Sequence, residues 1–159
     1  RSPSPVRDTP LSSRVRTTTV SLDNDAEVEE ANARFYRAFE GLDLQEMEAV
    51  WARGEQVRCI HPGWGLLVGW EAVRASWETI FKNTVEIRFS LSDVAVQVEG
   101  NLAWVTCTEN ILSQVGGNIS VTALLATNLF ERQGDAWLMI HHHGSHVFSP
   151  ESPPETDVA

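Results

Sequence analysis

Cysteine is scarce in this chain, with only Cys59 and Cys107 among 159 residues. Both stand in strand-like runs without CxxC spacing, so we expect buried free thiols rather than a disulfide scaffold. A reducing compartment follows, with the cytoplasm as the default. Basic residues are also few, 12 Lys and Arg against 22 Asp and Glu, and the formal net charge of -10 argues against nucleic acid and membranes as partners. No apolar run approaches the roughly 18 residues that a membrane helix needs.

The apolar residues that are present suffice for one folded domain. They make up 42% of the chain, and a chain of this length can bury a sizeable core. Residues 1–23 are rich in Ser, Thr, Pro and Arg, and we expect a disordered arm there. An organelle transit-peptide remnant has a similar composition and stays open as an alternative. Residues 149–159, Pro-rich and acidic, are expected to be a flexible tail. The domain is then residues 24–148.

Apolar residues spaced three and four apart predict three helices in the first half of the domain. The first begins at Asp23 or Asp25 and ends near Gly41. The second opens with Asp43 as N-cap and Glu46 three residues later, which is a capping-box pair. Between the second and third helices, QVRCIH predicts a short strand and PGWGLLVG a loop. The stripe of the third helix consists of Trp70, Val73, Trp77, Ile80 and Phe81.

From Glu86 onward the apolar period changes to two. Turn signals at 99–101, 116–118 and 133–135 divide residues 86–146 into four strands of an antiparallel meander. A change of phase predicts a bulge near Ser92-Asp93 that bends the sheet. Helices followed by strands indicate an α+β fold, with three helices packed on one face of a strongly bent antiparallel sheet.

Two-residue turns decide which side chains share a face of the sheet. They place His141 opposite Asn128 and His143 opposite Ala126 on the inner face. Small residues mixed with His, Asn and Glu indicate a lined cavity there rather than a solid core. The outer face is apolar and has no helix left to cover it, so we expect a homodimer through that face. The outer set is Trp104, Leu125, Leu129, Leu138, Ile140 and His142.

This order of elements, ending in W-x-x-x-HHH-x-S, resembles the nuclear transport factor 2-like (NTF2-like) superfamily, above all its SnoaL-like branch. Ketosteroid isomerases and the association domain of calmodulin-dependent kinase II are relatives of that branch. The matching stretches are FYRAFEGLDLQEMEAVW, CIHPGWGLLVGWEAVRASWETIF, AWVTCTENIL and ATNLFERQGDAWLMIHHHGSHV, which lie within residues 26–147.

The resemblance implies a cone whose interior binds a ligand. The fold hosts isomerases, dehydratases, cyclases, hydrolases and non-catalytic modules, so it does not imply one reaction. His143 falls where many SnoaL-like chains have a cavity-facing histidine. The aspartate and tyrosine set of ketosteroid isomerases is not evident, because the only tyrosine is Tyr36 and no aspartate falls on the inward face. This argues against steroid isomerisation.

The candidate catalytic residues are His143, His141 and Glu109. Apolar walls raise the pKa of a glutamate and lower that of a histidine, which suits enolisation, dehydration or isomerisation of a small carbonyl compound. Alternatively, Glu109 and a histidine simply satisfy each other. Trp64 lies in a Gly-rich loop that can cover a cavity mouth, whereas Trp70 also fits the helical core stripe. The candidate pocket residues are His61, Trp64, Cys107, Asn128, Trp70 and Tyr36.

Zinc is the alternative use of these histidines. Cys59 and His61 share the i, i+2 spacing of His141 and His143, and four such ligands could hold the ion. Nothing in the sequence places the first strand beside the last, so we expect no metal and no cofactor. Two hypotheses follow: a cofactor-independent His/Glu isomerase, dehydratase or cyclase, and a non-catalytic dimeric ligand-binding or association domain.

Overall fold

The computed structural model describes residues 15–148 as three helices and six strands. The parts of the expected arm and tail that fall on residues 1–14 and 149–159 lie outside the described residues. Helix α1 begins at Val15, within the expected arm, because neither proline nor glycine interrupts the chain between Pro10 and Gly41. The elements are α1 Val15–Glu40, α2 Leu44–Val50, β1 Arg58–Ile60, β2 Leu67–Val68, α3 Trp70–Asn83, β3 Thr84–Glu99, β4 Leu102–Val115, β5 Asn118–Gln133 and β6 Ala136–His146.

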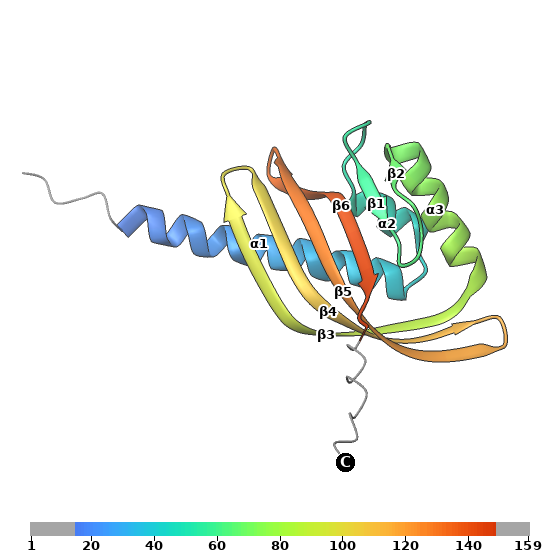
Figure 1. Ribbon diagram of the computed structural model, residues 1–159. Coiled ribbons are helices and arrows are strands. Elements are labelled where there is room, and N and C mark those ends of the chain that lie inside the picture. The colour runs from blue at the N-terminus through green and yellow to red at the C-terminus, as the bar shows by residue number, and fades with distance from the viewer. Residues whose placement is uncertain (1–14, 149–159) are drawn as a thin grey trace, which may run out of the picture.

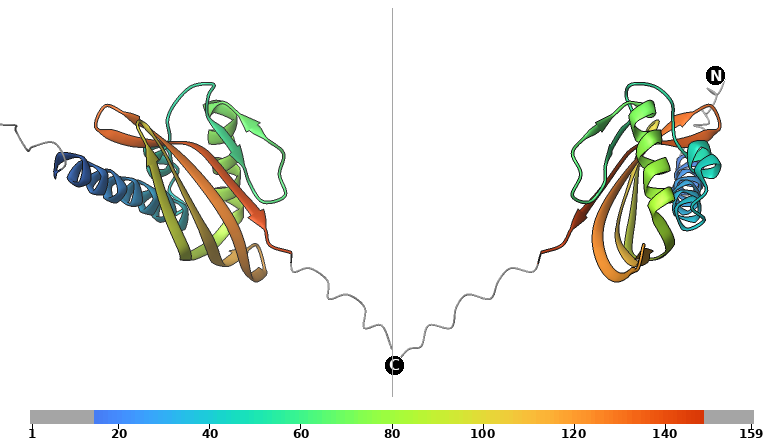
Figure 2. Two further views of the ribbon diagram at one scale, coloured as in Figure 1. Left: turned by 60° about the vertical axis from the view of Figure 1, so that its left-hand side comes forward. Right: turned by 90° about the vertical axis from the view of Figure 1, so that its right-hand side faces the viewer.

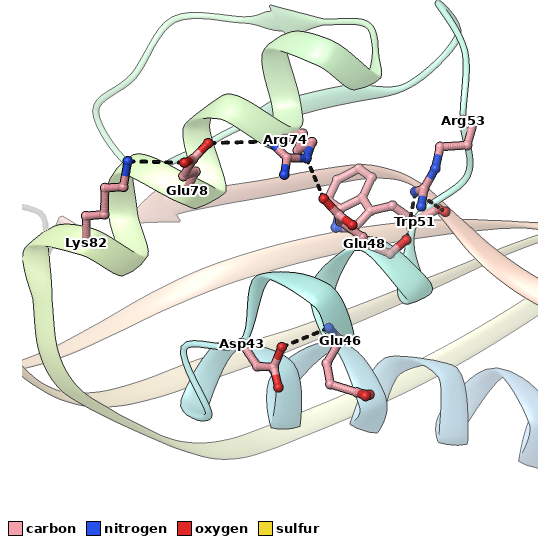
Figure 3. Close-up of polar contacts among 8 residues, drawn as sticks. All are labelled: Asp43, Glu46, Glu48, Trp51, Arg53, Arg74, Glu78 and Lys82. Carbon is pink, nitrogen blue, oxygen red and sulfur yellow. Dashed lines mark hydrogen bonds and ion pairs between the residues drawn. The ribbon is translucent and has the colours of Figure 1, made fainter.

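Polar contacts fix the short helix α2 at both ends (Figure 3). Asp43 is its N-cap and accepts a hydrogen bond of 3.1 Å from the backbone N–H of Glu46, which confirms the predicted N-cap. The Asp43 N–H donates to the carbonyl of Ala38 at 3.2 Å instead of to the Glu46 side chain, so the second half of the predicted capping-box pair does not form. After the last turn, Arg53 donates to the backbone carbonyl of Glu48 at 2.7 Å. The Glu48 carboxylate also binds Arg74 of α3, so the two helices are held together at the surface.

The six strands form one sheet in the order β2-β1-β6-β5-β4-β3, and the long strands bend strongly (Figure 1). The bulge predicted near Ser92-Asp93 is confirmed, because the β3–β4 register shifts between Ser92 and Ala95 and Asp93 has a φ of 52°. Helices α1 and α3 lie on the same side of the sheet (Figure 2). The predicted α+β fold is therefore confirmed.

One pairing differs from the expected antiparallel sheet. Strand β1 runs parallel to β6, so the sheet is mixed. A three-residue strand carries no periodic signal that could place it beside β6. The pairing puts Cys59 beside His142 and brings the chain that follows β1 to the inner face of β6.

The three hairpin turns have the predicted two-residue length. Gly100, Gly116 and Gly134 each begin a turn with φ near 60°, at 61°, 59° and 62°. A first turn residue with positive φ matches the right-handed twist of the flanking strands. These turns confirm the β4–β5 pairings of Asn128 with Val105 and of Ala126 with Cys107.

The β5–β6 register departs from the regular pairing at Ile140. Phe130 pairs with Met139, but the next residue of β5, Leu129, pairs with His141. Ile140 is thus the extra residue of a β-bulge, and every later side chain of β6 changes face. The sequence could not show this phase change, because apolar residues occupy both faces of β6 before the histidines.

The bulge corrects the predicted faces of the three histidines. His142 lies opposite Asn128 on the inner face and is 2% exposed. His141 and His143 lie on the outer face, where the first is half-buried and the second is exposed. His142 therefore cannot belong to a dimer interface, and the expectation that His141 and His143 face the cavity is wrong.

Aromatic side chains between the helices and the inner face of the sheet form much of the core. Phe35 of α1 is fully buried, and its ring centroid lies 5.6 Å from that of Trp77 of α3 and 4.9 Å from that of His142. These edge and tilted contacts pack α1 and α3 against β6. The core thus holds the His142 ring in place from two sides.

Candidate functional site

A cavity of about 410 Å³ lies between the inner face of the sheet and the helices. That volume lies within the range of small-molecule sites. Its polar wall includes His61 after β1, Glu109 on β4, and His142 and His146 on β6, and Trp64 lies at its edge. None of its lining residues among the described part of the chain is Lys or Arg. Its apolar walls are Phe39, Ile80, Ile87, Phe89, Ile111, Val115 and Leu124.

His142 is held by a buried amide on the neighbouring strand. Its Nδ1 lies 2.6 Å from Oδ1 of Asn128. An amide oxygen can only accept, so His142 donates through Nδ1–H and leaves Nε2 without a proton. Burial lowers the pKa of His142 well below 6.5, and the neighbouring histidines lower it further. The ring is therefore neutral at physiological pH.

His61 lies beside His142 on the cavity wall, with 6.3 Å between the ring centroids. Its Nε2 lies 2.9 Å from Oγ of Ser76, and Ser76 donates its own proton to the carbonyl of Val73 at 2.6 Å. The serine oxygen therefore accepts from His61, which leaves Nδ1 as the unprotonated nitrogen, 3.9 Å from Sγ of Cys59. Burial lowers the pKa of His61 to about 4, so this ring is neutral as well.

Glu109 is the one carboxylic acid on the cavity wall of the described chain. It is 2% exposed, and Oε2 has no hydrogen-bond partner among the described residues. Burial raises its pKa to about 7, although the nearby Tyr36 hydroxyl acts in the opposite direction. At neutral pH, Glu109 can both give and take a proton.

The other predicted pocket residues lie behind the cavity wall or away from it. Asn128, Tyr36 and Cys107 are buried in a polar cluster beside the cavity, where the Tyr36 hydroxyl lies 3.5 Å from Sγ of Cys107. Trp70 is 8% exposed and packs on Trp51 with 6.2 Å between the rings. Trp70 is thus a core residue.

Metal binding finds no support in the described part of the chain. There, no group of three or more His, Cys, Asp or Glu side chains is close enough to hold an ion. His141 and His143 lie on the opposite face from Cys59 and His61, so the four ligands considered for zinc do not converge. Burial also raises the pKa of the Cys59 thiol, which disfavours the thiolate that zinc requires.

Sequence reasoning missed residues that act on the site through a neighbour. Ser76 lies in the middle of α3 and had no motif to mark it. Gly144 lets β6 pass close to Pro62 and Glu109, since a Cβ there would lie 3.2 Å from Cγ of Pro62. Asn32 on α1 contacts Asn128 at 2.9 Å. A polar residue within an otherwise apolar helical stripe was the one available signal for Asn32.

No helix in the described residues is both long and apolar enough to cross a membrane.

Residues 28–149 match the family model described as SnoaL-like domain. The F-box protein SKIP8 of Arabidopsis thaliana is 30% identical over 114 residues, which are 72% of this chain and 47% of that protein. The chain thus spans about half the length of the curated relative that it matches.

Two solved structures share both fold and sequence with this chain. One is a Streptomyces avermitilis protein of the NTF2-like family for which dehydratase activity has been suggested. It is 38% identical, with a TM-score of 0.77, over 81% of this chain and 99% of that one. The other, from Thiobacillus denitrificans, has been suggested to be a calcium/calmodulin-dependent protein kinase type II association domain. It is 35% identical, with a TM-score of 0.68, over 76% of this chain and 94% of that one.

Proposed function

Because the chain belongs to the SnoaL-like domain family of the NTF2-like superfamily, we propose that its cavity performs acid–base chemistry on a small carbonyl compound without a cofactor. The observation that carries this proposal is one carboxylic acid with a pKa near 7 and two neutral imidazoles on the wall of one cavity. When the surroundings give two titratable groups different pKa values, one can act as the proton donor and the other as the proton acceptor.

In the proposed reaction His142 is the base and Glu109 the acid. Nε2 of His142 removes a proton from the carbon next to the carbonyl, and protonated Glu109 gives its proton to the carbonyl oxygen. The product is the enol. Return of a proton to another carbon isomerises the substrate, and departure of a β-hydroxyl as water dehydrates it. His61 is a second neutral imidazole beside the base, and its two ring nitrogens face Ser76 and Cys59.

The charges around the cavity favour an uncharged substrate. No Lys or Arg among the described lining residues could pair with a carboxylate or a phosphate. An anionic group would lose its hydration and would also lie near Glu109. The suggested dehydratase activity of the 38% identical relative supports dehydration as the first reaction to examine.

Deuterium exchange into the methyl group of 2-acetonaphthone tests the enolisation step directly. This ketone is flat, uncharged and able to accept from Glu109. We expect the full chain to catalyse the exchange in D₂O, followed by proton NMR. His142→Gln and Glu109→Gln should each slow it at least about tenfold, because a positioned acid or base contributes roughly 10²–10⁴-fold.

Matched controls lie elsewhere on the sheet. His143→Gln changes the neighbouring histidine on the outer face, and Glu99→Gln changes an exposed carboxylate at the end of β3, so neither should alter the rate. Equal rates in all variants would refute the assigned roles. Binding of the ketone without any exchange would favour the alternative function, a non-catalytic ligand-binding or association domain.

We also propose that the chain forms a homodimer through the outer face of the sheet. Trp104, Leu125 and Leu129 lie on that face, and Leu125 is 52% exposed. No described helix covers them, since α1 and α3 lie on the other side (Figure 2). Leu138 and Ile140 extend the apolar surface along β6. Beyond the bulge, His141 and His143 lie on this outer face, where His142 was expected from the sequence. The similarity to a suggested association domain supports self-association.

A further inference from the structure

Asn128 lies at the centre of a buried chain of side chains that spans α1, β5 and β6. Its Oδ1 faces Nδ1 of His142 at 2.6 Å, and its Nδ2 faces Oδ1 of Asn32 at 2.9 Å and the hydroxyl of Tyr36 at 3.1 Å. Asn128 is 0% exposed, so none of these partners can be replaced by solvent at small cost. Every polar atom of the amide is therefore engaged.

The neighbours of Tyr36 set the direction in which this amide points. The Tyr36 hydroxyl lies 3.5 Å from Sγ of Cys107, and it lowers the pKa of both the Cys107 thiol and the Glu109 carboxyl. A hydroxyl whose proton points toward Sγ of Cys107 offers its oxygen to Asn128 as an acceptor. Asn128 must then turn its nitrogen toward Tyr36 and its oxygen toward His142.

We propose that Asn128 is a positioning residue that keeps His142 in the Nδ1–H tautomer, so that Nε2 is unprotonated and available as the base. The inference rests on the proposed function, because it assigns the device that prepares His142 for its role. The same amide joins His142 to Tyr36, and Tyr36 lowers the pKa of Glu109, so the surroundings of the base and of the acid in the proposed reaction are in contact.

The substitution Asn128→Asp would convert the neutral contact into a charged pair. The introduced carboxylate would still accept from Nδ1–H, but its negative charge would favour the imidazolium form of His142. The titratable groups around the ring are His61 beside it, His141 and His143 on β6, Cys59 on β1 and, through residue 128, Tyr36. None is a carboxylate in contact with the ring, so the introduced charge should dominate the change.

Nitrogen-15 NMR of the histidine rings in the full-length chain tests the proposal, with the His142 signals assigned by their loss in His142→Gln. In the wild type we expect one tautomer, protonated at Nδ1, which stays neutral as the pH falls through the range where free histidines titrate. Asn128→Asp should raise the pKa of His142 while Nδ1 stays protonated. Asn128→Leu should allow the Nε2–H tautomer and slow 2-acetonaphthone exchange at least about tenfold. Asn118→Asp, an exposed change on β5, is the control and should do neither.

An Nε2–H tautomer in the wild type, or no greater shift in Asn128→Asp than in Asn118→Asp, overturns the proposal. If Asn128→Leu does not fold, the titration of Asn128→Asp still decides. The two proposals fail separately. Correct tautomers without exchange in the wild type contradict the proposed reaction alone. Exchange that depends on His142 but not on residue 128 contradicts the positioning role alone.

Discussion

Glu109 is the residue whose protonation should change most near neutral pH. Its pKa is 4.5 in an exposed setting and about 7 in the folded chain, so the folded state holds the proton more tightly. The stability from this group is fully present below about pH 4.5 and is lost as the pH rises through about 7. Glu109→Gln should remove that loss. As the pH rises from about 4.5 through about 7, the free energy of unfolding of Glu109→Gln, measured relative to that of the wild type, should increase by up to about 3 kcal/mol.

Urea unfolding at about pH 5, 6 and 8 measures this difference. The buried histidines have lowered pKa values, so both proteins lose stability from them as the pH falls below 6.5. This loss is the same in the wild type and the variant, so it cancels in the difference between their free energies of unfolding. A difference that does not change with pH would show that the Glu109 pKa is ordinary.

Gly144 should be intolerant of even one added methyl group. A Cβ there would lie 3.2 Å from Cγ of Pro62 and 3.6 Å from Oε1 of Glu109. The first distance is shorter than an ordinary contact, so Pro62 must move. We expect Gly144→Ala to cost about 1–3 kcal/mol of unfolding free energy and to slow 2-acetonaphthone exchange. Gly117→Ala is the matched control, because nothing lies within 4 Å of a Cβ at Gly117. Equal effects in chemical denaturation would contradict the contact argument.

Strand β6 changes phase through a single residue, and deletion of Ile140 tests that interpretation. Without Ile140, Met139 and His141 become neighbours and keep their partners Phe130 and Leu129. We therefore expect His142 to remain buried, with a lowered pKa, in a regular ladder. The loss of the half-buried Ile140 side chain should cost roughly 1–2 kcal/mol. Histidine NMR and amide exchange provide the measurement. An exposed, freely titrating His142 in the deletion variant would refute the bulge.

At the level of elements, local signals predicted most of the fold. Asp43, the three glycine turns and the Ser92-Asp93 bulge each depend on nearby residues, and each is where the sequence indicated. The errors concern β1 and β6, where the outcome depends on distant packing. The pairing of β1 with β6 and the bulge at Ile140 had no local signal. The pocket was therefore predicted with Glu109 and His61 in it, but with the wrong pair of histidines from β6.

The whole molecule should self-associate, and this association should weaken in acid. Light scattering near pH 8 should give about twice the chain mass of 17.7 kDa. Burial, His143 and Arg58 lower the pKa of His141, so this ring on the outer face resists protonation. As the pH falls below the ordinary histidine range, protonation of His141 would place a positive charge on this face of both copies and weaken their contact. Trp104→Glu should give a monomer at both pH values. A wild type that is monomeric at micromolar concentration and neutral pH would contradict the homodimer.

The extra residue at Ile140 also affects how this chain should be compared with its relatives. A three-nucleotide deletion at this point would leave each histidine on its present face, whereas a relative that pairs regularly and keeps the same count would expose His142 and enclose His141 and His143. Two homologous chains with the same HHH triplet could thus carry different histidines in the cavity. An alignment made without a gap at this position would equate residues that face opposite sides of the sheet. Equivalent histidines in homologous chains therefore have to be identified by strand pairing, as the residue that pairs with position 128, rather than by their order within the HHH sequence.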